Sequence, residues 1–107
     1  MTSTLIPNPA FGRIGIMGRA NKPSVIQSIY QICDFFHEQG LPLLIDHQTA
    51  RLPALDFARL GDIATIERSL LGGACDLVIV VGGDGSLLHA AQVLVKHKVP
   101  VVGVNRG

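Results

Sequence analysis

One stretch of the sequence combines glycines, a carboxylate and a hydroxyl at a spacing that suits nucleotide chemistry. Gly82, Gly83 and Gly85 surround Asp84, and Ser86 follows where a helix-forming sequence begins. Glycines lack Cβ atoms, so their loop can turn sharply and a ligand can approach the backbone closely. The free N–H groups at the start of a helix favour an anionic group. The stretch therefore predicts a site for a phosphate-bearing ligand.

Asp84 is the residue of this stretch that does not suit a phosphate. A carboxylate repels phosphate oxygens, so Asp84 is better suited to hold a metal ion or to accept a proton from a hydroxyl. A purely structural interpretation stays open, because Asp-Gly is a common turn pair and Asp near a helix start caps free N–H groups. His89, on the polar side of the following helix, could contact the same ligand, although an exposed surface histidine gives the same pattern.

The segments on either side predict where this stretch lies in the fold. Residues 78–81 are four consecutive β-branched aliphatic residues, which are typical of a strand buried on both faces of a parallel sheet. Ligands of such sheets bind beyond the carboxyl ends of the strands. We expect the next helix to run from Ser86 to about Lys96. Its expected apolar side consists of Leu87, Ala91, Leu94 and Val95, with His89, Gln92 and Lys96 opposite.

Strand and helix patterns alternate along the rest of the chain. The expected strands are residues 13–18, 43–46 and 99–104, the expected helices are residues 24–40 and 62–71, and residues 47–60 are expected to form a loop with one irregular turn. Ser24 is the expected N-cap of the first helix in a capping box with Gln27, and Gly40 is its expected left-handed end. Gly72 and Gly73 are expected to stop the second helix. This alternation predicts an α/β fold, a layered and mainly parallel sheet flanked by helices.

Length, composition and charge exclude several classes of protein. The chain has 107 residues with 48% hydrophobic and 16% charged residues, so we expect one globular domain over residues 13–107 after a flexible leader, residues 1–12. A net charge of +1 without a basic stripe predicts no nucleic-acid partner. No long apolar run or signal-peptide pattern is present, which predicts a cytoplasmic protein without a membrane partner. Cys33 and Cys75 fall in apolar patterns and are expected to be buried free thiols.

The loop after the first strand carries two further candidates. Arg19 and Lys22 lie at the same end of the expected sheet as the glycine-rich stretch, where they could attract phosphates. A solvated loop explains the same residues, and it is the interpretation that the sequence favours.

Three stretches of the sequence together resemble the NAD kinase family. They are Ile14–Ile16, Asp76–Leu88 and Val101–Gly107. The Gly-Gly-Asp-Gly motif alone is shared with 6-phosphofructokinases and with diacylglycerol and sphingosine kinases. The Val-Asn-Arg-Gly ending after a short strand favours NAD kinases, and the two motifs in this order cover nearly all of the chain after the leader.

The resemblance implies ATP-dependent phosphorylation of the adenosine ribose 2′-hydroxyl of NAD, which gives NADP, in a Rossmann-like or phosphofructokinase-like N-terminal domain. By this resemblance, Asp84 would accept the proton of that hydroxyl, and Asp84, Gly85, Gly82 and Gly83 would contact NAD. His89 lies where many family members place a basic or polar NAD contact. A divalent metal such as Mg²⁺ would accompany ATP, although the sequence shows no metal-ligand cluster. Small-molecule nucleotides are the implied partners, and the family usually forms homo-oligomers.

The sequence also departs from the family pattern and leaves rivals open. The family's second, mostly β domain, with its Asn-Glu motif and much of the NAD pocket, is not among these residues, so we expect little or no activity from this chain alone. A phosphofructokinase-like or lipid kinase remains an alternative. So does a non-catalytic α/β module or assembly partner, although a receiver domain should show paired acids after its first strand, where Met17-Gly18-Arg19 stands.

Overall fold

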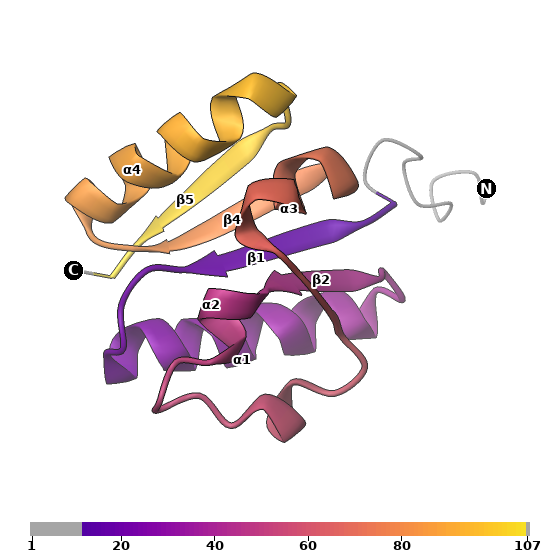
Figure 1. Ribbon diagram of the computed structural model, residues 1–107. Coiled ribbons are helices and arrows are strands. Elements are labelled where there is room, and N and C mark those ends of the chain that lie inside the picture. The colour runs from indigo at the N-terminus through magenta and orange to yellow at the C-terminus, as the bar shows by residue number, and fades with distance from the viewer. Residues whose placement is uncertain (1–11, 107) are drawn as a thin grey trace.

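The computed structural model describes residues 12–106, except for the side chains of Asp84 and Ser86, and shows strands and helices in alternation (Figure 1). The elements are β1 (Ile14–Gly18), α1 (Pro23–Glu38), β2 (Leu43–Asp46), α2 (His47–Ala50), η3 (Phe57–Leu60), β3 (Ala64–Ile66), α3 (Arg68–Ala74), β4 (Leu77–Gly82), α4 (Asp84–Leu94), η4 (Val95–His97) and β5 (Val101–Asn105). The expected leader lies, apart from its last residue, outside the described residues.

The strands form a single five-stranded sheet in the order β3-β2-β1-β4-β5. Every neighbouring pair is parallel, with Ile16 opposite Ile45 and Ile79, and Ile79 in turn opposite Val102. The chain thus begins in the middle of the sheet, builds outward to β3, and returns to place β4 on the other side of β1. The expected layered, parallel α/β fold is confirmed.

Alternate residues of the strands pack into two separate cores, one on each face of the sheet. One core joins α1 to Ile14, Ile16, Ile79 and Val81, while the other joins α3 and α4 to Met17, Val78 and Val80. Residues 78–81 are all buried, as the run of β-branched residues predicted. The edge strand β5 is less well covered, because Val101 and Val102 remain 41% and 48% exposed.

Helix α1 is confirmed, but its start differs from the prediction. It begins at Pro23 after Lys22, so proline supplies the first helical position, where its fixed φ fits and its missing N–H costs nothing. Ser24 therefore lies inside the helix, and its hydroxyl donates to the backbone oxygen of Arg106 at 3.2 Å instead of capping. The expected capping box is wrong. At the other end Gly40 has a φ of +72°, the left-handed conformation expected of it.

The largest difference from the sequence-based prediction concerns residues 47–74. The expected loop contains two short helices, α2 and η3, and the expected helix over residues 62–71 is wrong: β3 pairs with β2, and α3 starts only at Arg68. Gly72 and Gly73 lie within α3 instead of ending it. A Cβ on Gly72 would lie 2.7 Å from Cδ2 of His97, so the glycine allows α3 to pack against the end of the α4 segment.

Helix α4 also differs in its start and in its buried side. It begins at Asp84 after the N-cap Gly83, two residues before the expected start. Ala90 and Leu94 are its buried residues, whereas Ala91 is exposed and Val95 is 71% exposed, so the expected apolar side was partly wrong. The small Ala90 side chain lets the helix lie close to the sheet, a feature that a search for large apolar residues does not detect. His89, Gln92 and Lys96 are exposed as expected.

Gly15 provides a test of how tightly the second core is packed. A Cβ on Gly15 would lie 2.8 Å from Sγ of Cys75 and 3.2 Å from Leu71. We expect Gly15→Ala to lower the free energy of unfolding by about 1–3 kcal/mol, because an extra methyl overpacks a filled core. Urea unfolding followed by circular dichroism measures the change. Adding Cys75→Ala should recover part of the lost stability. The control is Gly85→Ala, because a Cβ at Gly85 would meet no atom within 4 Å. Equal stability of the Gly15 and Gly85 variants would contradict the tight packing around Gly15.

Both cysteines are buried free thiols, as expected. Because ionised thiols are disfavoured in the folded state, we expect the protein to lose stability at alkaline pH. Burial raises the pKa of the Cys33 thiol to about 12 and that of Cys75 to about 11, from an ordinary 9.0. Because the folded-state pKa is the higher one, this stabilisation is present below pH 9.0 and is lost as the pH rises toward the folded values. Denaturant unfolding between about pH 8 and 11 should show the decline, with a shallower decline for Cys33→Ala; an unchanged slope would refute the assignment.

Candidate functional site

The predicted site lies where the chain reverses its direction of travel across the sheet. After β1 the chain crosses the α1 face toward β2, whereas after β4 it crosses the opposite face through α4 toward β5. The carboxyl ends of β1 and β4 therefore diverge into loops on opposite faces, which is where open α/β sheets bind ligands. The backbone N–H of Arg19 donates to Val81 O at 3.0 Å and that of Arg106 donates to Gly82 O at 2.9 Å. These bonds fix the starts of the loops after β1 and β5 against β4.

The glycine-rich stretch occupies this position with its backbone open to a ligand. Gly82 ends β4, Gly83 is the N-cap of α4, and Asp84 and Gly85 are the first helical residues. A Cβ built on Gly85 would meet no atom within 4 Å, and the residue is exposed. None of the three glycines here has a positive φ. A left-handed turn is therefore not what requires glycine at these positions. The side chain of Asp84 lies outside the described part of the chain.

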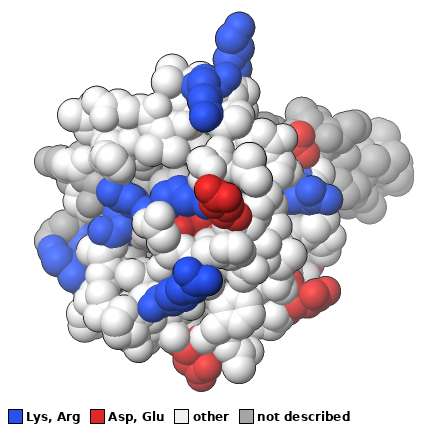
Figure 2. Space-filling view, in the orientation of Figure 1, with Lys and Arg blue, Asp and Glu red and all other residues white. Residues whose placement is uncertain are grey.

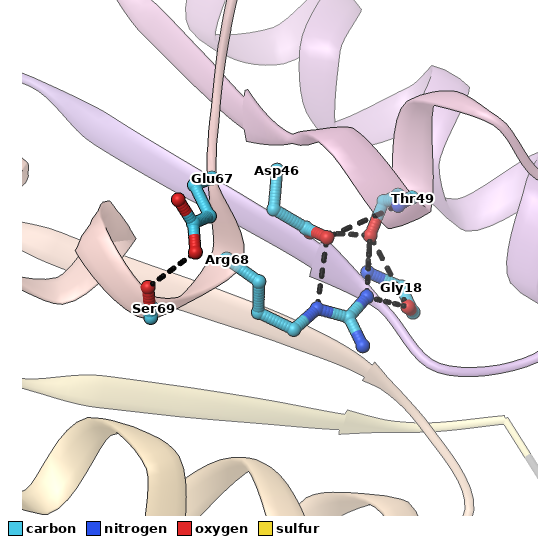
Figure 3. A network of polar contacts seen from close by, with 6 residues as sticks. All are labelled: Gly18, Asp46, Thr49, Glu67, Arg68 and Ser69. Atoms are coloured by element: carbon cyan, nitrogen blue, oxygen red, sulfur yellow. Dashed lines mark hydrogen bonds and ion pairs between the residues drawn. The ribbon is translucent and has the colours of Figure 1, made fainter.

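A buried polar network lies beside this stretch, at the ends of β1 and β2 (Figure 3). Asp46 is fully buried, and its Oδ2 accepts from Nε of Arg68 at 2.8 Å. The Thr49 hydroxyl lies 2.5 Å from Oδ1 of Asp46 and accepts the backbone N–H of Gly18 at 2.8 Å. Nη2 of Arg68 donates to Gly18 O at 3.1 Å and to Thr49 Oγ1 at 3.2 Å. Side chains from after β2 and β3 thus hold the end of β1.

Sequence reasoning missed Asp46, Thr49 and Arg68. Asp46 was placed correctly at the end of β2, but its role depends on Arg68, which comes 22 residues later in a segment assigned to the wrong helix. A local signal was present, since a carboxylate that ends an apolar strand with threonine three residues on is a helix-capping pattern. Asp46 does cap α2, accepting the backbone N–H of Thr49 at 3.1 Å.

Arg19 follows β1 directly and lies next to this network. Together with Gln48, Glu67, Arg68, Ser69, His89 and Val93 it lines a hollow of about 290 Å³. Its Nε is buried and has no hydrogen-bond partner among the described residues. Burial lowers the pKa of the Arg19 guanidinium, the positive charge of Arg68 lowers it further, and Asp46 opposes the shift. Arginine nevertheless stays protonated at neutral pH, so two guanidinium cations, those of Arg19 and Arg68, line this hollow together with the Glu67 carboxylate.

The surface view agrees with this mixture of charges. Figure 2 shows Lys and Arg side chains on either side of an acidic group in the middle of the face, over the start of α3. The carboxylate of Glu67, the N-cap residue of α3, accepts from the Ser69 hydroxyl at 3.1 Å. His89 is exposed on α4 and borders the same hollow as Arg19, so the structure brings these two sequence candidates together. Lys22 is exposed and lines none of this hollow, which fits the solvated interpretation.

Two further features bear on what can bind. Over residues 12–106, apart from the side chains of Asp84 and Ser86, no group of three or more His, Cys, Asp or Glu side chains is arranged to hold a metal ion. In the same range no helix is both long enough and apolar enough to cross a membrane.

Comparisons with known proteins give consistent results. The family model described as ATP-NAD kinase N-terminal domain matches residues 14–107. The proteins named NAD kinase from Psychrobacter arcticus and Acinetobacter baylyi are 56% and 48% identical to the chain over 102 and 98 residues. These matches cover 95% and 92% of this chain but only 31% and 30% of the relatives, so the chain spans less than a third of their length.

A solved structure shows the same fold. Yeast NADH kinase, in a crystal structure with NADH, superposes with a TM-score of 0.70 over 94% of this chain and 31% of that chain. At 19% sequence identity this likeness shows the arrangement of strands and helices and does not by itself define a ligand.

Removing one partner of the buried ion pair between Asp46 and Arg68 should lower the stability of the protein strongly. We expect Arg68→Met to lower the free energy of unfolding by about 3–5 kcal/mol, because it leaves the Asp46 carboxylate buried without a cation. Urea unfolding measures this, with Lys96→Met at an exposed position of η4 as a control for the lost charge. In a double-mutant cycle, adding Asp46→Asn should cost less on the Arg68→Met background than alone. Additive costs would show that the pair is not coupled.

Proposed function

This chain belongs to the NAD kinase family, and we propose that it forms the nucleotide-binding part of an enzyme that transfers a phosphoryl group from ATP to the 2′-hydroxyl of the adenosine ribose of NAD. The observation that carries the proposal is the position of Gly-Gly-Asp-Gly, at the carboxyl end of β4 beside the point where the chain direction reverses. Residues 13–107 are the N-terminal α/β domain in this proposal, and a second domain completes the NAD pocket.

The chemistry assigned to Asp84 is that of a general base. As the ribose oxygen bonds to the γ-phosphorus, the bond from that phosphorus to the bridging oxygen breaks, ADP leaves, and the hydroxyl proton passes to the Asp84 carboxylate. Phosphoryl transfer depends mainly on positioning and electrostatics, so one oriented carboxylate at the nucleophile suffices for this role. The first turn of α4, which begins at Asp84, fixes the backbone of the residue at the site.

The neighbouring residues are proposed to hold NAD. Gly82, Gly83 and Gly85 let the ribose approach the backbone, which the open space at Gly85 supports. His89, exposed on α4, supplies a polar contact. Mg²⁺ would accompany ATP in this proposal, but the described side chains offer no set that fits a metal, so we assign it no protein ligand here. The whole protein is proposed to be a cytoplasmic homo-oligomer.

We expect Asp84→Asn in the full-length protein to lower kcat for NAD phosphorylation by about 10²–10⁴-fold, the usual contribution of a general base. The reason is that an amide cannot accept the hydroxyl proton. Coupled detection of NADP at saturating ATP and NAD measures the change, and Lys96→Gln is the control. The short chain should be inactive in the same assay.

Two outcomes would contradict this proposal. Comparable turnover by the short chain would show that the second domain is dispensable. Phosphorylation of fructose 6-phosphate in place of NAD by the full-length protein would favour a phosphofructokinase-like enzyme instead.

A further inference from the structure

The hollow beside the glycine-rich stretch contains a cation, Arg19, whose hydrogen-bonding groups are not all used by the described residues. Arg68 is committed, because its guanidinium bonds Asp46, Gly18 O and Thr49. Arg19 comes from the neighbouring loop, and its Nε is buried without a hydrogen-bond partner in the described structure. A buried N–H without an acceptor is unfavourable unless a ligand supplies one. An anion is the ligand that would accept this N–H and form a charge-assisted hydrogen bond with the guanidinium.

The hollow lies next to the proposed NAD contacts and shares one of them, His89. Its described lining comes from the loop after β1, from α2, from the start of α3 and from one side of α4, and Gly82, Gly83 and Gly85 are not part of it. His89 stands on the wall that the two sites share. A ligand in the hollow would therefore lie next to one bound on the glycine-rich stretch, which is the relation that donor and acceptor need for direct phosphoryl transfer.

We propose that the hollow between Arg19, Arg68 and His89 binds the linked phosphates of the phosphoryl donor, with Arg19 as the residue that contacts them. This inference rests on the function proposed above and assigns a second ligand subsite to it. A planar guanidinium matches the oxygens of linked phosphates better than a point charge does, because it can donate two parallel hydrogen bonds. The ligand chemistry is a chain of phosphates, which ATP and inorganic polyphosphate both carry.

Arg68 and Asp46 act in this subsite as positioning residues. The ion pair and the Thr49 bonds hold the backbone of Gly18, the residue directly before Arg19. The Arg19 N–H is in turn fixed on Val81 O at 3.0 Å. The backbone is therefore held at Gly18 and at the N–H of Arg19, so little backbone order has to be gained on binding. Glu67 also lines the hollow, but it is exposed, and water and salt screen its repulsion of an anion.

The test uses tripolyphosphate as the probe, titrated by calorimetry into the full-length protein, with ATP and NAD titrated separately. We expect Arg19→Gln to weaken tripolyphosphate and ATP binding at least tenfold and to change NAD binding less than threefold. Arg19→Lys should restore only part of the affinity, because it returns the charge without the planar donors. Lys96→Gln, which removes an equal charge at an exposed position outside the lining of the hollow, should leave all three affinities unchanged. Circular dichroism confirms that each variant is folded.

Each alternative result has a defined meaning. If Arg19→Gln and Lys96→Gln weaken tripolyphosphate and ATP binding equally, the effect is one of general charge and the subsite is overturned. If Arg19→Gln weakens NAD binding alone, Arg19 contacts NAD and the subsite is again overturned. Absence of tripolyphosphate and ATP binding by folded full-length protein would also overturn it. A lower dissociation constant for tripolyphosphate than for ATP would support the subsite and favour polyphosphate as the donor. Binding that depends on Arg19 in a protein that does not phosphorylate NAD would uphold the subsite and refute only the proposed function.

Discussion

The ion pair between Asp46 and Arg68 is the interaction on which the carboxyl edge of the sheet depends. Asp46 is fully buried, and a carboxylate in that position is tolerated only when a cation and hydrogen-bond donors surround it. Arg68 and Thr49 provide these, and the same two side chains bond the backbone of Gly18. One buried charge thereby ties the ends of β1 and β2 to the start of α3.

The hydrogen bonds around Asp46 explain how the polar loops at the carboxyl edge of an apolar sheet can be ordered. The two cores on either side are built from alternating aliphatic residues, and they set the strand order without specifying how the loops lie. Apolar packing carries little directional information, whereas hydrogen bonds to a buried carboxylate are directional. The cores therefore stabilise the fold and the network gives its carboxyl edge a defined shape, with the glycine-rich stretch and Arg19 at fixed places beside it.

The parts of this arrangement that the sequence predicted are those with strong local patterns. The run of β-branched residues at 78–81, the strand 43–46 and the left-handed Gly40 each follow from neighbouring residues, and all were confirmed. The prediction failed over residues 62–71, because Ile63, Ile66 and Leu70 have helical spacing while β3 forms only through pairing with β2. Of the candidate site, the glycine-rich stretch was predictable, but the pairing of Asp46 with Arg68 was not, because nothing local in either segment indicates its partner.

Strand β5 is an edge strand in the described part of the sheet, and this position has a consequence for the behaviour of the chain in solution. Val101 and Val102 expose large parts of their side chains on this edge strand, and Leu88 and Val95 of the neighbouring α4 segment are also exposed. An edge strand with exposed apolar side chains is a template for the addition of another strand, either from the same polypeptide or from a second copy. A chain of this length studied alone will thus tend toward edge-to-edge aggregation as its concentration rises, even while each copy keeps its native fold.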